Sequence, residues 1–125
     1  MRERIEEARE FIKLAADVGS TAIKVRPNGV PEDVPQEKTF EQIGKSLREI
    51  GVFGKDHGVE IWMEVHGADS SHPPYIAEMM KHCGHPSVGL TWNCNDSDLK
   101  DGEVEPYFNL LKGHIRNVHM RDLTV

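Results

Sequence analysis

The sequence predicts an α/β fold in which four parallel strands, with helices on one face, form half of a (β/α)8 barrel. Two observations predict it. Helical and strand-like segments alternate along the 125 residues, which is typical of parallel strands joined by helical crossovers. Each strand-like segment also carries polar residues on one face, whereas a sheet covered by helices on both faces would be apolar throughout.

The residue pattern in the first half of the sequence predicts two helices, each followed by a strand. Apolar residues recur at helical spacing from Arg2 to Val18, and a glycine follows as the stop. The next segment, TAIKVR, alternates like a strand and ends at a proline. A Pro-rich, acidic loop over residues 27–38 leads to a second helix. We expect this helix to begin at Thr39, because Thr39 and Gln42 have the spacing of a capping box.

The strand over residues 59–67, VEIWMEVHG, carries the chemistry of the sequence. Its apolar residues fall on one face, while Glu60, Trp62, Glu64 and His66 fall on the other. A carboxylate and an imidazole two residues apart at the carboxyl end of a strand are expected at the mouth of an α/β barrel, where active sites lie. The alternative is a strand with one face in water, as in many antiparallel sheets.

Two further helix and strand pairs complete the chain. A helix is expected from Pro74 to Gly84, since proline is favoured in the first turn of a helix and glycine just beyond its end. Strand-like alternation returns over residues 87–93. A polar loop then leads to a short helix around Tyr107 and to a last strand over residues 114–120.

The last strand is expected to alternate without interruption. Val118 and Met120 would fall on one face, and Ile115, Asn117 and His119 on the other. This pattern would place an amide and an imidazole beside the polar residues of the other strand ends.

The predicted domain is incomplete as a ring. A closed barrel needs eight strands and commonly about 250 residues, whereas these 125 residues predict four strands. We therefore expect one partial barrel domain over residues 1–125, which is part of a longer protein or pairs with a second copy in a homodimer that completes the barrel.

The composition excludes several classes of partner. Acidic residues outnumber basic ones by 21 to 15, and the net charge of −6 argues against nucleic acid as the main partner. Apolar runs are far shorter than the ~18 residues of a membrane span, and the charged amino terminus lacks the pattern of a secretory signal. A cytoplasmic protein without membrane contact is therefore expected.

The cysteines and nearby histidines do not form a typical zinc motif. Two cysteines are too few for a disulfide framework, and we expect both to be reduced. His82, Cys83, His85 and Cys94 are residue types that bind zinc. Their spacing lacks the gap of roughly two to four residues between paired ligands, which disfavours a structural zinc.

Four segments together resemble a known family. They are GSTAIKVRPNG, GVEIWMEVHG, HPSVGLTWNCND and HIRNVHMRDL. They resemble the xylose isomerase-like TIM barrel superfamily, in particular the sugar phosphate isomerase/epimerase proteins that share the pattern of the endonuclease IV family. The resemblance covers essentially the whole chain, as strands four to seven, and implies a partial (β/α)8 TIM barrel.

The resemblance also implies a divalent metal (Mn, Mg, Co or Zn) at the barrel mouth. The family holds it on a Glu of strand five, an Asp of strand six, a His of strand seven and a Glu of strand eight. Glu64 and His119 match two of these positions. Asn93 stands where the family has Asp, and Asp96 where a His that contacts substrate often follows. The implied metal set is thus Glu64, His119, Asn93 and Asp96.

The implied reaction, in the complete protein, is aldose–ketose isomerisation or ketose epimerisation of a sugar or sugar phosphate through an enediolate. Glu64 and His66 are the implied catalytic residues. Lys24, Arg26, His66 and Asp96 are the implied substrate-binding residues. The 125-residue chain alone is expected to be inactive.

Alternatives stay open at this point. An amide oxygen brings no charge, so Asn93 weakens attraction for Mg or Mn, which favours a non-catalytic barrel that binds a carbohydrate or a protein. An apurinic endonuclease-like metal hydrolase is a second alternative, disfavoured by the acidic composition and by Asn93. Lys24 and Arg26 could instead pair with Glu60 and Glu64 as interior salt bridges.

Overall fold

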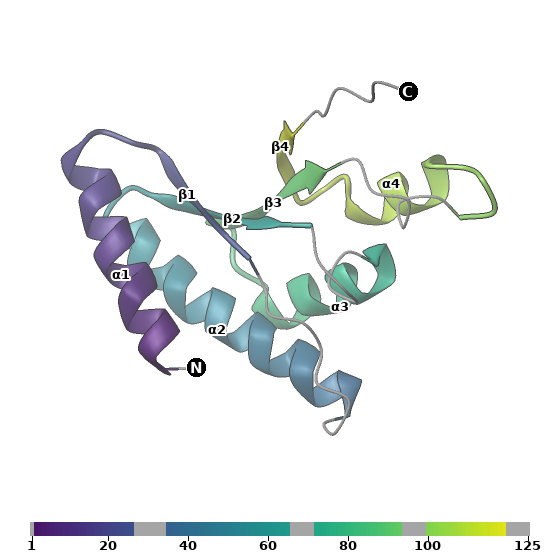
Figure 1. The fold of residues 1–125 in the computed structure, drawn as a ribbon, viewed down its shortest axis with the longest axis horizontal. Coiled ribbons are helices and arrows are strands. Elements are labelled where there is room, and N and C mark those ends of the chain that lie inside the picture. Colours follow the sequence, from purple (N-terminus) through teal and green to yellow (C-terminus); the bar gives the residue numbers. More distant parts are fainter. Residues whose placement is uncertain (1, 27–34, 66–71, 94–99, 120–125) are drawn as a thin grey trace, which may run out of the picture.

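The computed structural model describes residues 2–26, 35–65, 72–93 and 100–119, with the backbone alone for Arg2, Glu3, Asn93 and His119. Helices and strands alternate along the chain (Figure 1), which confirms the predicted α/β fold. In chain order the elements are α1 (Arg2–Asp17), β1 (Ala22–Val25), α2 (Gln36–Asp56), β2 (Glu60–Glu64), α3 (Pro73–Cys83), β3 (Val88–Asn93), α4 (Glu105–Leu111) and β4 (Ile115–His119).

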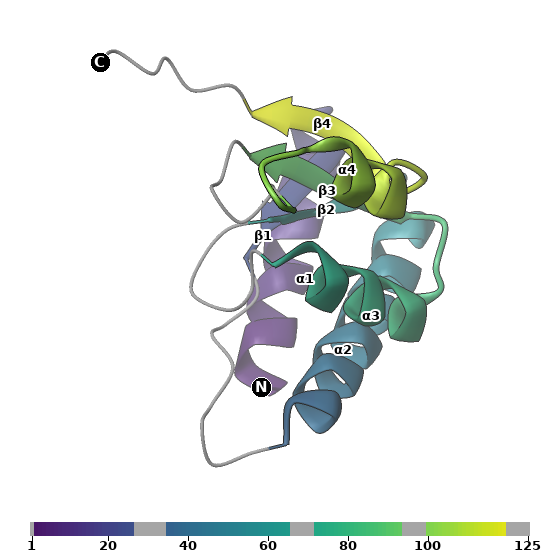
Figure 2. The ribbon, with the colours of Figure 1, turned by 90° about the vertical axis from the view of Figure 1, so that its right-hand side faces the viewer.

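The four strands form one parallel sheet in the order β1-β2-β3-β4. Parallel neighbours need a crossover between them, and a helix supplies it in each case. Figure 2 shows α1, α2 and α3 on one side of this sheet. Sequential parallel strands with helices on one side are the arrangement of a β/α barrel, so the predicted partial barrel is confirmed.

The hydrophobic core lies between the sheet and the helices. Ile61 and Met63 of β2 and Leu90 of β3 are fully buried there. Each of the four helices contributes buried residues to the same cluster, among them Ile12, Leu47, Ile76 and Leu111. Residues that alternate with these strand positions therefore occupy the opposite side of the sheet, which we call the inner face.

A glycine lets α2 and α3 pack closely. A Cβ atom on Gly44 would collide with the Cβ of His82 and would lie 2.6 Å from the backbone oxygen of Met79, so a larger residue would force the helices apart. Although α2 is 21 residues long, no helix in the described ranges is both long and apolar enough to cross a membrane.

The second helix starts earlier than predicted. It begins at Gln36, and the backbone oxygen of Pro35 accepts hydrogen bonds from the N–H groups of Lys38 and Thr39. Thr39 is buried inside the helix, so the predicted capping box at this residue is wrong. Proline has a fixed φ close to the helical value and lacks a donor that needs a partner, which suits Pro35 to the start of the helix.

The last strand does not alternate as predicted. Ile115 pairs with Leu90 of β3. The next residue of β3, Thr91, pairs with Asn117, so β4 has one extra residue at this point. Such a bulge changes the face of the residues around it. Ile115 therefore packs against the helix-side core, and the prediction that it shares a face with Asn117 is wrong.

Candidate functional site at the carboxyl ends of the strands

Glu64 is a buried carboxylate at the end of a central strand. It is the last residue of β2 and lies on the inner face, because its neighbours Met63 and Val65 belong to the core. In the sheet it pairs with Thr91 of β3. Only 3% of Glu64 is exposed. A charge buried to this degree needs compensating partners.

Two cations at the end of β1 neutralise Glu64. The Nε of Arg26 donates a hydrogen bond to Glu64 Oε2 at 2.9 Å, and the Nζ of Lys24 lies 3.6 Å from the same oxygen. The side chains of Arg26 and Lys24 are 65% and 47% exposed, against 4% for Glu64. The cations thus stay hydrated while they cover the carboxylate. The interior salt bridges considered for Lys24 and Arg26 are present at Glu64.

The backbone brings Asn93 and His119 to the same edge of the sheet. Asn93 ends β3, His119 ends β4, and the two residues pair with each other. They stand farther toward the carboxyl end than Glu64. Three neighbouring strands thus end in Glu64, Asn93 and His119. The other two predicted site residues, His66 and Asp96, lie outside the described residues.

The described side chains fit a divalent metal only in part. Within the ranges that the structure describes, no three His, Cys, Asp or Glu side chains gather as a ligand set. Glu64 offers one carboxylate, and Arg26 and Lys24 hold its Oε2. A divalent cation at that oxygen would be repelled by these two positive charges at close range. The described part of the site therefore supplies one metal ligand and two competing cations.

A second ion pair lies on the inner face nearer the amino ends of the strands. The Nε of Arg116 on β4 is 3.4 Å from Oε1 of Glu60 on β2. The pair crosses β3 at Gly89, where a Cβ atom would collide with the side chain of Arg116 and would lie 2.9 Å from the backbone oxygen of His114. Glu60 thus pairs with β4 and not with the cations of β1. The glycine inside SVGLTWN is the sequence signal that could indicate this crossing.

Two buried polar atoms flank Glu64. They are Trp62 Nε1 and Thr91 Oγ1, and neither has a hydrogen-bond partner among the described residues. The sequence pattern places both residues on the inner face, but it does not show that these atoms are unpaired. An unpaired buried polar group costs about 1–3 kcal/mol. In the described part of the chain, these two unpaired atoms therefore destabilise the inner face.

The described residues of the candidate zinc set lie in the last turn of α3 or just after it. Cys83 is fully buried, and burial raises the pKa of its thiol, which disfavours the thiolate that binds zinc. The Nδ1 of His85 accepts a hydrogen bond from the backbone N–H of Ser87, and burial lowers the pKa of His85. Cys94 lies outside the described residues.

Comparisons with known proteins agree on one fold. A family model described as xylose isomerase-like TIM barrel matches residues 1–124. No curated protein matches the sequence. Several solved structures do match.

A D-tagatose 3-epimerase-like protein is 23% identical with a TM-score of 0.77, and the match covers 98% of this chain and 51% of that one. A structure of the IOLI protein with a bound zinc atom is 17% identical with a TM-score of 0.79, covering 95% and 44%. A xylose isomerase-like TIM barrel protein from Mycobacterium smegmatis in complex with magnesium is 15% identical with a TM-score of 0.73, covering 94% and 44%. The chain thus spans about half the length of these proteins or less, and the likeness is one of fold.

Proposed function

Because the chain belongs to the xylose isomerase-like TIM barrel family, we propose that its residues form one half of a divalent-metal-dependent sugar isomerase or epimerase. One observation carries the proposal. Glu64, which is 3% exposed, ends a central strand at the edge of the sheet where active sites of β/α barrels lie. A buried carboxylate at such a place is a candidate proton acceptor.

The proposed reaction starts at the carbon next to a sugar carbonyl. Glu64 accepts a proton from this carbon, and the electron pair of the C–H bond forms an enediolate. Return of the proton to the neighbouring carbon, together with transfer of the hydroxyl proton from one oxygen to the other, gives an isomer. Delivery of a proton to the other face of the same carbon by a second group gives an epimer. His66, two residues beyond Glu64, is the proposed second catalytic residue.

Glu64, Asn93, Asp96 and His119 are the proposed ligands of a divalent metal, which can be Mn, Mg, Co or Zn. When bound, such a metal supplies positive charge that stabilises the negative charge developing on the substrate. Carboxylate, amide and imidazole are suitable donors for these ions. The neutral amide of Asn93 and the ion pair of Glu64 with Arg26 both lower the expected metal affinity.

The proposed substrate is a sugar or sugar phosphate. Lys24 and Arg26 are proposed to bind it, together with His66 and Asp96. The ion pair with Glu64 uses the Nε of Arg26, so the two Nη groups can bind a hydroxyl, carboxylate or phosphate. Lys24 is half exposed beside it and adds a second positive charge.

A barrel that binds a carbohydrate or a protein partner without turnover is the second candidate. The same ion pairs favour it, because Arg26 and Lys24 occupy the oxygen of Glu64 that a metal would use. In this case the inner face keeps its charges paired, and the site recognises a partner through the exposed cations.

The test is deuterium incorporation from heavy water into a panel of ketoses and their phosphates, followed by NMR, with a complete barrel that contains these residues and is loaded with Mn. Exchange at the carbon next to the carbonyl reports proton removal even when little product forms. Glu64→Gln should lower the exchange rate by about 100-fold or more, the range for loss of a general base.

Glu60→Gln is the matched control, since Glu60 lies on the same face of the same strand and pairs with Arg116. It should change the exchange rate by no more than a few-fold. Full exchange in the Glu64→Gln variant would contradict the proposal. Saturable binding of a sugar with no exchange in any member of the panel would favour the binding barrel instead.

A further inference from the structure

The two edge strands of the described sheet, β1 and β4, each lack a neighbour on one side. In the described part of the chain, β1 and β4 each pair with one strand, so each presents an unpaired row of backbone N–H and C=O groups. All four strands are parallel. A strand that extends the sheet beyond β4 in the same pattern must therefore run parallel to it, as β1 of a second copy can.

Exposed apolar side chains gather at the same two ends. Eight large apolar residues are exposed in the described ranges. Three lie on α1 or just after it (Phe11, Leu14 and Val18), four lie on α4, at its N-cap or on β4 (Val104, Phe108, Leu110 and Val118), and Val52 lies on α2. Apolar groups exposed together in this way mark surfaces that a partner covers.

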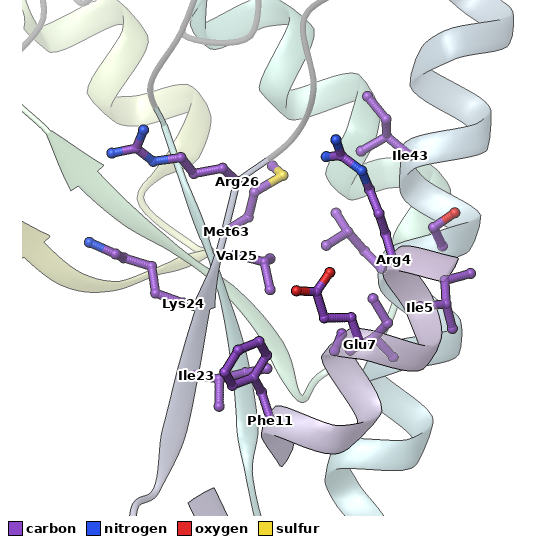
Figure 3. Close-up of a pocket in the computed structure, with 14 residues that line it drawn as sticks. Arg4, Ile5, Glu7, Phe11, Ile23, Lys24, Val25, Arg26, Ile43 and Met63 are labelled. Carbon is purple, nitrogen blue, oxygen red and sulfur yellow. The ribbon is translucent and has the colours of Figure 1, made fainter. Parts of the chain in front are cut away.

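A groove of about 620 Å³ lies between α1 and β1 (Figure 3). Ile23 and Val25 point from β1 toward α1, while Lys24 and Arg26 point to the other side of the strand (Figure 3). Phe11, Ile23, Val25, Ile43, Leu47 and Met63 make up most of the apolar lining. In a β/α barrel each helix covers the strands on both sides of it. The groove is therefore the place for the helix-facing side chains of a strand that lies beside β1.

Val118 of β4 is an exposed apolar residue that faces the helix side, as the groove beside β1 requires of a neighbouring strand. It is 54% exposed, and it pairs with Trp92, which belongs to the helix-side core. Because paired residues of parallel strands share a face, Val118 also faces the helix side. If β4 of another copy lies beside β1, its Val118 enters the groove next to Phe11.

We propose that two copies of this chain join with β4 of each beside β1 of the other, and so complete an eight-stranded ring. A half-turn relates the copies, so the two places where β4 of one copy meets β1 of the other are identical. We call these two places the seams. Because both are used within one pair, association ends at two chains. Four strands from each copy make the eight of a complete barrel. In the closed ring the apolar groups at both ends of the sheet are covered.

Closure also completes the inner face. The two inner faces turn toward each other, so the polar residues at the carboxyl ends of both sets of strands surround one mouth. Two copies of Glu64 then line one mouth. This shared site rests on the proposed function, whereas the two seams do not.

The mass of the purified chain in solution tests the seams without any assay of activity. Light scattering on a size-exclusion column should give twice the 14.1 kDa of one chain. Val118→Lys should reduce the mass to that of one chain, because the lysine would have to bury its charge among the apolar residues that make up most of the groove lining. Val52→Lys is the matched control, since Val52 is also an exposed valine but lies on α2 and does not line the groove, and it should leave the mass doubled.

Circular dichroism checks that both variants stay folded. A chain that remains at 14.1 kDa at all concentrations would overturn the proposal and would leave the groove to a strand of a longer protein. A mass that keeps rising with concentration would overturn the closed ring. A dimer that Val118→Lys leaves intact would overturn the assignment of the seam.

A disulfide locates the seam directly. Cysteines at position 118 and at position 23 or 25 lie on opposite edges of one sheet, so a bond between them must join two chains. In a Cys94→Ser background, Val118→Cys combined with Ile23→Cys or Val25→Cys should give a covalent dimer on a non-reducing gel. Absence of this dimer in both combinations would contradict the seam, whatever the result of the deuterium experiment.

Discussion

At the scale of residues, Glu64 is buried whereas its partners Lys24 and Arg26 are exposed. This difference predicts how their substitutions affect stability. Replacing Lys24 and Arg26 together by methionine should lower the free energy of unfolding by about 2–3 kcal/mol, because the carboxylate stays buried after it loses these two cations. Glu64→Gln should lower it by about 1 kcal/mol or less, since exposed cations are hydrated once the carboxylate is gone. Urea unfolding followed by circular dichroism measures both changes.

Lys45→Met is the control for this comparison. It removes an ion pair with Glu41 in which both side chains are exposed, so it should leave the free energy of unfolding almost unchanged. Equal losses for the Lys24 and Arg26 double variant and for Glu64→Gln would show that burial of the carboxylate does not set the cost.

Single residues of the site were predictable where alternation decides their position. The alternation of VEIWMEVHG correctly places Glu64 on the inner face, and it allows Lys24 and Arg26 as partners. It cannot show that Glu60 pairs with Arg116, because that contact depends on a bulge and on a glycine in the strand between them. The roles proposed for the other site residues remain predictions.

At the scale of elements, Gly89 controls how β3 and β4 fit together. Gly89→Ala should destabilise the protein by about 1–3 kcal/mol, because the new Cβ would meet the side chain of Arg116 and the backbone oxygen of His114. Gly113→Ala is the matched control, since its Cβ would meet nothing within 4 Å among the described residues. Thermal unfolding of both variants makes the comparison, and an equal loss in the two would contradict this account.

Element types could be predicted more reliably than element limits. Apolar periodicity correctly predicts four helices and four strands in the described ranges, because the buried faces of these elements need it. The start of α2 could not be found in this way. Two start signals compete within a few residues, and the helix begins after Pro35 and not at the capping box of Thr39.

At the scale of the whole molecule, the proposed ring links folding to association. Since the apolar groove and the exposed ends are covered only in the dimer, diluting the protein should lower its unfolding midpoint. The Val118→Lys variant should show a midpoint that does not change with concentration. Calorimetry over a wide range of protein concentrations measures both, and a wild-type midpoint independent of concentration would contradict the link.

The half-barrel architecture was predictable from the polar strand faces and the alternation of elements, because both follow from local sequence. How the ring closes was not predictable to the same degree. Closure depends on surfaces such as the groove beside α1, and that groove is formed by residues of α1, β1, α2 and β2 together. Such a surface is visible only after the elements are packed.

The order of the elements also has a consequence for tandem duplication of the sequence. Every strand is preceded by its own helix, so the chain is a fourfold repeat of one unit. In a tandem duplicate, α1 of the second repeat would follow β4 of the first and would connect it to the next β1, as α2 already connects β1 to β2. Duplication would then turn one of the two seams into an ordinary loop, and a single polypeptide could close the ring without any new element.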